Sequence, residues 1–159
     1  MSKRIIVALL LFDVAWALAI FGTGRWLGWQ VLLTIAILAC IPRTHWLNAS
    51  LLALTGIAID GLLTASGVMA FATPGLPLFL VVLWLQFALC IAAILDKLPS
   101  GWFPLALICA LSGGGSYLLG DWLGATQLQP TAWIGALVIA LAWAGLFPLV
   151  VKRLQHRMA

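Results

Sequence analysis

The chain has little charge and contains no glutamate. Only 8% of its 159 residues are charged and 65% are hydrophobic, whereas about 25% of the residues in a soluble domain are charged. So few charged side chains cannot coat a water-facing surface, which excludes an ordinary soluble domain. The net charge of +4 comes without a Lys/Arg cluster interleaved with aromatic residues, so nucleic acid is not an expected partner.

Motifs for metal binding and for common hydrolytic or phosphoryl-transfer chemistry are also missing. The three cysteines, Cys40, Cys90 and Cys109, form no CxxC pair, which excludes a disulfide framework or a zinc site. The sequence has no HExxH, no GxSxG and no P-loop. We therefore expect no metal and no cofactor. These absences argue against an enzyme without excluding an acid–base reaction at Asp13 and Asp60.

Long apolar runs dominate what is present. A helix needs about 20 residues, with a range of roughly 17–25, to cross the hydrocarbon core of a bilayer. The runs are continuously apolar rather than alternating, which favours helices over membrane strands. The sequence predicts an all-α integral membrane protein, a compact bundle of six transmembrane helices in a single domain over residues 1–159. The expected spans are residues 5–21, 26–41, 47–71, 76–95, 102–120 and 131–151.

The basic residues predict an orientation for this bundle. With six spans and a cytoplasmic N-terminus, seven Lys and Arg residues fall on the cytoplasmic side and only Arg25 on the other. Such a bias is typical of inner-membrane proteins. We expect both termini to be cytoplasmic, in the inner membrane of a bacterium. The seven cytoplasmic residues are Lys3, Arg4, Arg43, Lys97, Lys152, Arg153 and Arg157.

The stretch "GIAIDGLLTASG" places a carboxylate in an apolar span. Small and polar residues recur there at spacings of three and four, which puts them on one helical face suited to close packing against another helix. We therefore expect Asp60 to point into the bundle. A charged Asp at the bilayer centre costs about 2.5–3.5 kcal/mol, so Asp60 is expected to be protonated, hydrogen-bonded to neutral groups or hydrated in a cavity. The face consists of Ala49, Ala53, Gly56, Asp60, Thr64 and Gly67.

Two further polar residues fall at a similar depth. At about 1.5 Å per residue, Asp13 and Gln86 lie roughly 13 Å from the cytoplasmic ends of their helices and Asp60 roughly 20 Å. Three interpretations stay open: hydrogen bonds that join helices, a ligand site, or a proton relay. The candidate ligand-binding residues are Asp13, Asp60, Gln86, Trp16, Trp84, Thr64, Ser112, Ser116 and Tyr117.

The fifth span contains three consecutive glycines in "LSGGGSYLLG". Glycine weakens a helix by about 1 kcal/mol per residue relative to alanine. One interpretation is a broken helix that lines a cavity. The other is an intact helix that crosses a neighbour closely at Gly113, Ser116 and Gly120.

Several stretches resemble one family of small bacterial inner-membrane proteins that carries only a domain-of-unknown-function label. They are "GIAIDGLLTASGVMAF", "LPLFLVVLWLQFALCIAAIL", "LALICALSGGGSYLLGDWLGA" and "ALAWAGLFPLVV". The resemblance covers most of the chain in order. It implies a bacterial inner membrane, six spans and a connection with lipids, and it implies no particular activity.

Three functions are compatible with these features. The first is a protein that binds or transports a small apolar or amphipathic molecule, with the lipid bilayer as its surroundings. The second is a membrane enzyme, or an enzyme subunit, that acts on lipid. The third is a structural or assembly partner of another membrane protein, in which the Asp residues merely join helices.

Overall fold

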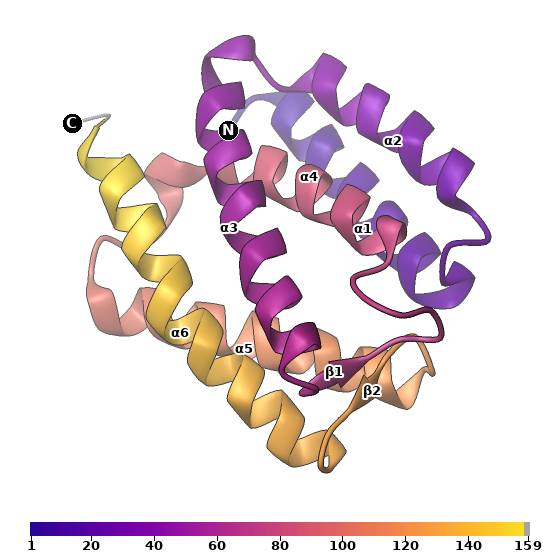
Figure 1. Ribbon diagram of the computed structural model, residues 1–159. Helices are drawn as coiled ribbons and strands as arrows, with labels where there is room; N and C mark the ends of the chain where they lie inside the picture. Colours follow the sequence, from indigo (N-terminus) through magenta and orange to yellow (C-terminus); the bar gives the residue numbers. More distant parts are fainter. Residues whose placement is uncertain (158–159) are drawn as a thin grey trace.

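The computed structural model describes residues 1–157, and Figure 1 shows that helices dominate this part of the chain. Short 3₁₀ turns, η1 (Arg43–His45) and η2 (Leu95–Lys97), lie in two connections, and two short strands, β1 (Met69–Ala70) and β2 (Gln127–Leu128), lie in two others. The six α-helices of this part are α1 (Lys3–Gly22), α2 (Leu27–Cys40), α3 (Trp46–Ala65), α4 (Leu78–Ala93), α5 (Trp102–Trp122) and α6 (Ala132–His156).

Four of the helical segments are long and apolar enough to cross a membrane. They are Lys3–Gly22, Arg43–Ala65, Trp102–Trp122 and Ala132–His156. The helix α2 has 14 residues and α4 has 16, so they are about 21 and 24 Å long, against a hydrocarbon core of about 30 Å. The prediction of an all-helical protein suited to a membrane is confirmed, with four full-length segments and two short ones.

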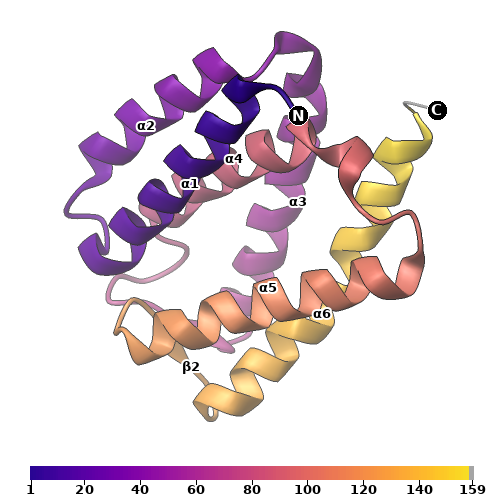
Figure 2. The ribbon, with the colours of Figure 1, turned by 180° about the vertical axis from the view of Figure 1, so that it is seen from behind.

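The helices form two groups that α3 joins (Figures 1 and 2). The first group contains α1, α2 and α4, which pack against one another, and the second is the tightly packed pair α5 and α6. The helix α3 packs against α4 on one side and α6 on the other. In the described part of the chain, α4 and α5 make no extensive direct contact.

The third helix is shorter than its predicted span. It ends at Ala65 rather than near Phe71, and Gly67 follows with a positive φ of 79°, which glycine adopts without strain. The chain then extends into β1, which pairs antiparallel with β2 in the register Met69 to Leu128. This two-stranded ribbon ties the end of α3 to the connection between α5 and α6 and was not predicted from the sequence.

One end of the molecule carries most of the basic residues and both described chain ends (Figure 1). The end of α6 is fixed there, because the Lys152 ammonium donates to the Ser100 carbonyl at 3.1 Å. The Lys97 ammonium lies 2.6 Å from the Asp96 carboxylate on this surface, and its hydrogen bond lowers the pKa of Asp96. Arg25 lies in the connection between α1 and α2, outside this basic end.

Candidate functional site

Asp60 lies on the small face of α3 and has no exposed surface, as the spacing predicted. One turn earlier, Gly56 makes room for the indole of Trp84, since a Cβ added at Gly56 would lie 2.1 Å from Trp84 Cζ3. Small residues at such a face let neighbouring helices approach closely. The glycine thus allows the α4 indole to lie directly against α3.

Two side chains from other helices bind the Asp60 carboxyl. The Trp84 indole Nε1 of α4 donates to Asp60 Oδ2 at 2.6 Å, and the Tyr117 hydroxyl of α5 donates to the same oxygen. Among residues 1–157, no group donates to Asp60 Oδ1 in hydrogen-bond geometry. The carboxyl therefore connects three helices through neutral donors, which is one of the arrangements expected from the sequence.

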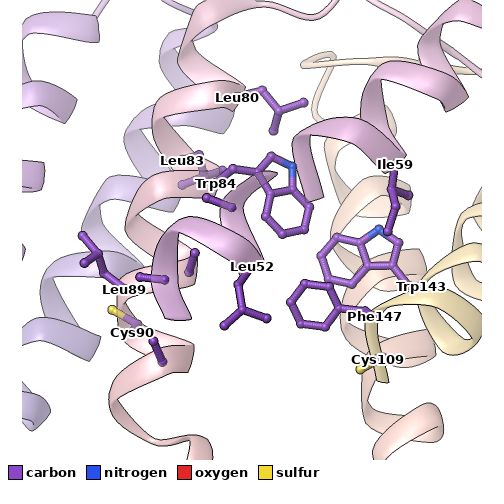
Figure 3. Close-up of a cluster of buried hydrophobic side chains, with 14 of the residues drawn as sticks. Leu52, Ile59, Leu80, Leu83, Trp84, Leu89, Cys90, Cys109, Trp143 and Phe147 are labelled. Atoms are coloured by element: carbon purple, nitrogen blue, oxygen red, sulfur yellow. The ribbon is translucent and has the colours of Figure 1, made fainter. Parts of the chain in front are cut away.

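An aromatic cluster surrounds this polar group. The Trp84 and Trp143 rings lie with centroids 5.1 Å apart, and Phe147 stacks on Trp143 at 5.6 Å, as Figure 3 shows for these three side chains. Phe87 packs edge-on to Trp84 at 5.5 Å. Within the described part of the chain, the buried Trp143 Nε1 meets no acceptor in hydrogen-bond geometry. The cluster fills the space between the two helix groups with aromatic surface from α4 and α6.

A cavity of about 80 Å³ opens beside the cluster. Its wall is mainly aromatic and aliphatic, and two serine hydroxyls and the Tyr117 side chain supply its polar groups. The cavity is open to the surface rather than enclosed, since Ser112 in its wall is exposed. Its mainly apolar wall suits a small apolar group. Its lining residues are Phe12, Leu80, Leu83, Trp84, Phe87, Ser112, Ser116, Tyr117 and Trp143.

Four of the predicted site residues line this aromatic cavity and two others lie nearby. Trp84, Ser112, Ser116 and Tyr117 form part of its wall. Asp60 lies behind the wall and reaches it through Trp84 and Tyr117. Thr64 is half-buried, and its hydroxyl donates to the Asp60 backbone carbonyl at 2.7 Å. Trp16, also half-buried, packs against the hydrophobic core from α1 and does not line the cavity.

Gln86 is not part of this site. It is fully buried, and its Nε2 donates to the Gln30 carbonyl at 2.8 Å and to the Thr34 hydroxyl at 2.9 Å. Gln86 follows Trp84 by two residues, so the two side chains leave α4 on nearly opposite faces. Gln86 therefore lies at a depth similar to that of Asp60 without lying close to it. It joins α4 to α2 instead.

Asp13 also lies away from the cavity, although its neighbour Phe12 lines it. Asp13 is exposed on the outer face of α1, beside the exposed Leu10 and Val14. The structure thus does not bring Asp13, Asp60 and Gln86 together, although they were expected at a similar depth. The 100° step between successive helix residues separates Asp13 from the face that Phe12 occupies.

The glycine run leaves α5 intact. The helix continues from Trp102 to Trp122, so the interpretation as a broken helix is wrong. The run serves a close crossing with α6, where a Cβ on Gly113 would lie 2.4 Å from Trp143 Cδ2 and one on Gly114 would lie 2.9 Å from the Ala136 carbonyl. The crossing therefore uses Gly113 and Gly114.

Three aromatic residues of the cavity were not predicted from the sequence. They are Phe12, Phe87 and Trp143. Trp143 lies far from both ends of its apolar run, as Trp84 does, and tryptophans of membrane proteins usually gather at the interface instead. That shared depth was the available signal. The two phenylalanines carry no comparable signal, because phenylalanine is common throughout apolar helices.

Among residues 1–157, no group of three or more His, Cys, Asp or Glu side chains could hold a metal ion.

The chain also resembles a known family. Neither the curated proteins nor the solved structures include a detectable match to the chain. A family model described as "Protein of unknown function (DUF2878)" matches residues 5–149. The match confirms the resemblance noted in the sequence, and the chain belongs to the DUF2878 family of proteins of unknown function.

Proposed function

We propose that this protein binds a small apolar or amphipathic molecule, or the apolar part of a lipid, in the aromatic cavity. The observation that carries the proposal is the cavity itself, about 80 Å³ of space with a mainly apolar wall between the two helix groups. Binding sites for small molecules are concave and largely apolar, with a few polar groups that fix orientation. Ser112, Ser116 and Tyr117 would supply those groups.

The placement of Asp60 favours binding over catalysis. Asp60 does not line the cavity, and its Oδ2 already accepts from Trp84 and Tyr117. A general acid or base must lie within hydrogen-bond reach of the reacting atom, directly or through one water. Asp60 would instead hold the Trp84 and Tyr117 side chains of the cavity wall in position.

We place this protein in the inner membrane of a bacterium, with six crossings and both termini in the cytoplasm. The basic residues of the two chain ends and of the connections with η1 and η2 support this orientation. The helices α2 and α4 are short for a crossing, and local thinning of the bilayer and interfacial residues accommodate short spans at modest cost.

A photolabelling experiment tests the binding proposal. The full chain in lipid nanodiscs is labelled with 3-trifluoromethyl-3-phenyldiazirine, with and without excess unlabelled phenyl compound. We expect competable labelling, that is, labelling that the excess unlabelled compound reduces, of the α4 and α5 segments around Trp84 and Tyr117. Ser116→Phe fills the cavity and should remove that labelling. Leu111→Phe adds the same ring to α5 at a side chain that is 67% exposed and should leave it unchanged. Equal competable labelling in both variants would refute the proposal.

A second candidate function is assembly with another membrane protein, and Asp13 is the observation that favours it. Asp13 lies on an exposed apolar face near the middle of α1, where a charged carboxylate is costly. A partner helix with an Arg, Lys or hydroxyl donor at the same depth would satisfy it. Native mass spectrometry from membranes should then show the protein in a complex with a partner. Asp13→Leu should abolish this complex, and the control Val14→Leu should preserve it. If the unsubstituted protein is a monomer, this function is refuted.

A further inference from the structure

A larger cavity lies at the end of the molecule that carries the ribbon. It has a volume of about 360 Å³ and lies between the α1–α2 connection, the segment from β1 to α4, and the α5–β2 connection. Among the described residues, those that line it include Thr23, Thr73, Thr126 and Gln127 and none with a charged side chain. We call it the outer cavity. Its polar groups suit an uncharged headgroup that carries hydroxyl or amide groups.

A narrow third cavity of about 30 Å³ lies between the outer cavity and the aromatic cavity. It shares Phe71, Phe79, Ala125 and Thr126 with the wall of the outer cavity. It shares Leu80, Ser116 and Tyr117 with the wall of the aromatic cavity. The three cavities therefore lie in series, from the ribbon end to the Tyr117 side chain that binds Asp60.

We propose that the three cavities form one site for a single-chain amphiphile with an uncharged polar headgroup. The headgroup lies in the outer cavity, the chain passes the narrow cavity, and the chain end lies among the aromatic side chains. This inference rests on the proposed binding function and adds the class of ligand and its direction. A narrow middle section fits one hydrocarbon chain and excludes a lipid with two chains side by side.

Gly120 is a position at which a larger side chain would narrow the third cavity. It lines the narrow cavity from α5. A Cβ added there would meet Thr126 Cγ2 at 3.5 Å and Ile20 Cδ1 at 3.7 Å, which is ordinary contact. Alanine therefore fits at this position and narrows the passage, and leucine closes it. Gly115 lies on the same helix with no atom near its Cβ position, so it provides a matched control.

Two photoreactive dodecanols test the inference on the full chain in nanodiscs, one with a diazirine at the chain end and one with a diazirine beside the hydroxyl. Labelled peptides are mapped by mass spectrometry, with excess unlabelled dodecanol as competitor. The chain-end probe should label residues 80–87 and 112–117. The headgroup probe should label residues 70–79 and 123–127. The reverse pattern, or the same pattern for both probes, would overturn the direction we infer.

The variants test the connection between the cavities. Gly120→Leu should reduce competable labelling by the chain-end probe at residues 80–87 about tenfold, the factor expected when roughly two methylene groups lose their buried site. Labelling by the headgroup probe should persist, which also shows that the variant is folded. Gly120→Ala should give a smaller reduction, and Gly115→Leu none. Unchanged chain-end labelling in both Gly120 variants would overturn the inference.

Failure of this inference and failure of the proposed function give different results. If the phenyl diazirine labels the aromatic cavity competably while the Gly120 variants change nothing, the aromatic site stands and the series of cavities is wrong. If neither the phenyl compound nor the chain-end probe labels the aromatic cavity competably, the binding function itself is wrong.

Discussion

The buried Asp60 side chain accepts hydrogen bonds from two neutral donors. The Trp84 indole and the Tyr117 hydroxyl both donate to Oδ2, and each comes from a different helix. A buried acceptor that loses its partner costs about 1–3 kcal/mol, so the three side chains stabilise the fold as a unit. Trp84 and Tyr117 also line the aromatic cavity, so the carboxyl behind them holds part of its wall.

A double-mutant cycle measures this coupling. Asp60→Asn and Tyr117→Phe keep the side-chain shapes and alter the hydrogen bond between them. We expect their effects on the free energy of unfolding to be non-additive by at least about 1 kcal/mol, since contacting residues couple by 0.5–3 kcal/mol. The measurement is reversible unfolding in mixed detergent micelles.

Asp13 provides the control for that cycle. Asp13→Asn changes an exposed side chain on α1, so it should add to Tyr117→Phe within about 0.5 kcal/mol. An additive Asp60–Tyr117 pair would contradict the role given to the carboxyl.

At the scale of the helices, glycines make room for tryptophans. Trp84 of α4 lies against Gly56 of α3, and Trp143 of α6 lies against Gly113 of α5. The two indoles then meet at 5.1 Å between the helix groups. Each contact places a large aromatic ring where a β-carbon would otherwise stand.

Alanine substitutions test these contacts in matched pairs. Gly56→Ala and Gly113→Ala should each destabilise the protein by about 1–3 kcal/mol, because the added methyl overlaps a rigid indole. Gly61→Ala and Gly115→Ala place the methyl in open space and should be neutral or stabilising by up to about 1 kcal/mol, the gain in helix propensity. Thermal unfolding in one detergent would compare all four. Equal effects of the two substitutions on α3, or of the two on α5, would contradict the packing described.

The helices themselves could be predicted from the sequence, and their mutual contacts could be predicted only in part. Continuous apolar runs indicated where the helices lie, and the spacing around Asp60 correctly placed it inside the bundle. Depth alone could not say which way Asp13 and Gln86 face, because one residue turns a helix by 100°. The ribbon was missed because two-residue strands leave no alternating pattern.

For the whole molecule, the decisive feature is the division into two helix groups. The helix α3 and the ribbon connect the groups, and residues of α4, α5 and α6 line the space between them. The aromatic cavity occupies part of that space. Most of the basic residues gather at the end opposite the ribbon, whereas Arg25 lies in the α1–α2 connection and Asp121 binds the ribbon at Leu128.

Cysteine accessibility tests the orientation we propose. In a background that lacks Cys40, Cys90 and Cys109, single cysteines replace Ser100 at the basic end and Thr73 at the ribbon end, both exposed. A membrane-impermeant maleimide should label Thr73→Cys from the periplasm and Ser100→Cys only in inverted vesicles, as the positive-inside rule requires. Labelling of both from one side would contradict six crossings.

A bromobenzene soak shows whether the aromatic cavity is a binding site. Crystals of the full chain are soaked in bromobenzene, and an anomalous difference map locates the bromine atoms. We predict a peak inside the cavity bounded by Trp84, Tyr117 and Trp143. Bromine peaks confined to the exposed apolar side chains of the helices, with none in the cavity, would show that the cavity is not a binding site.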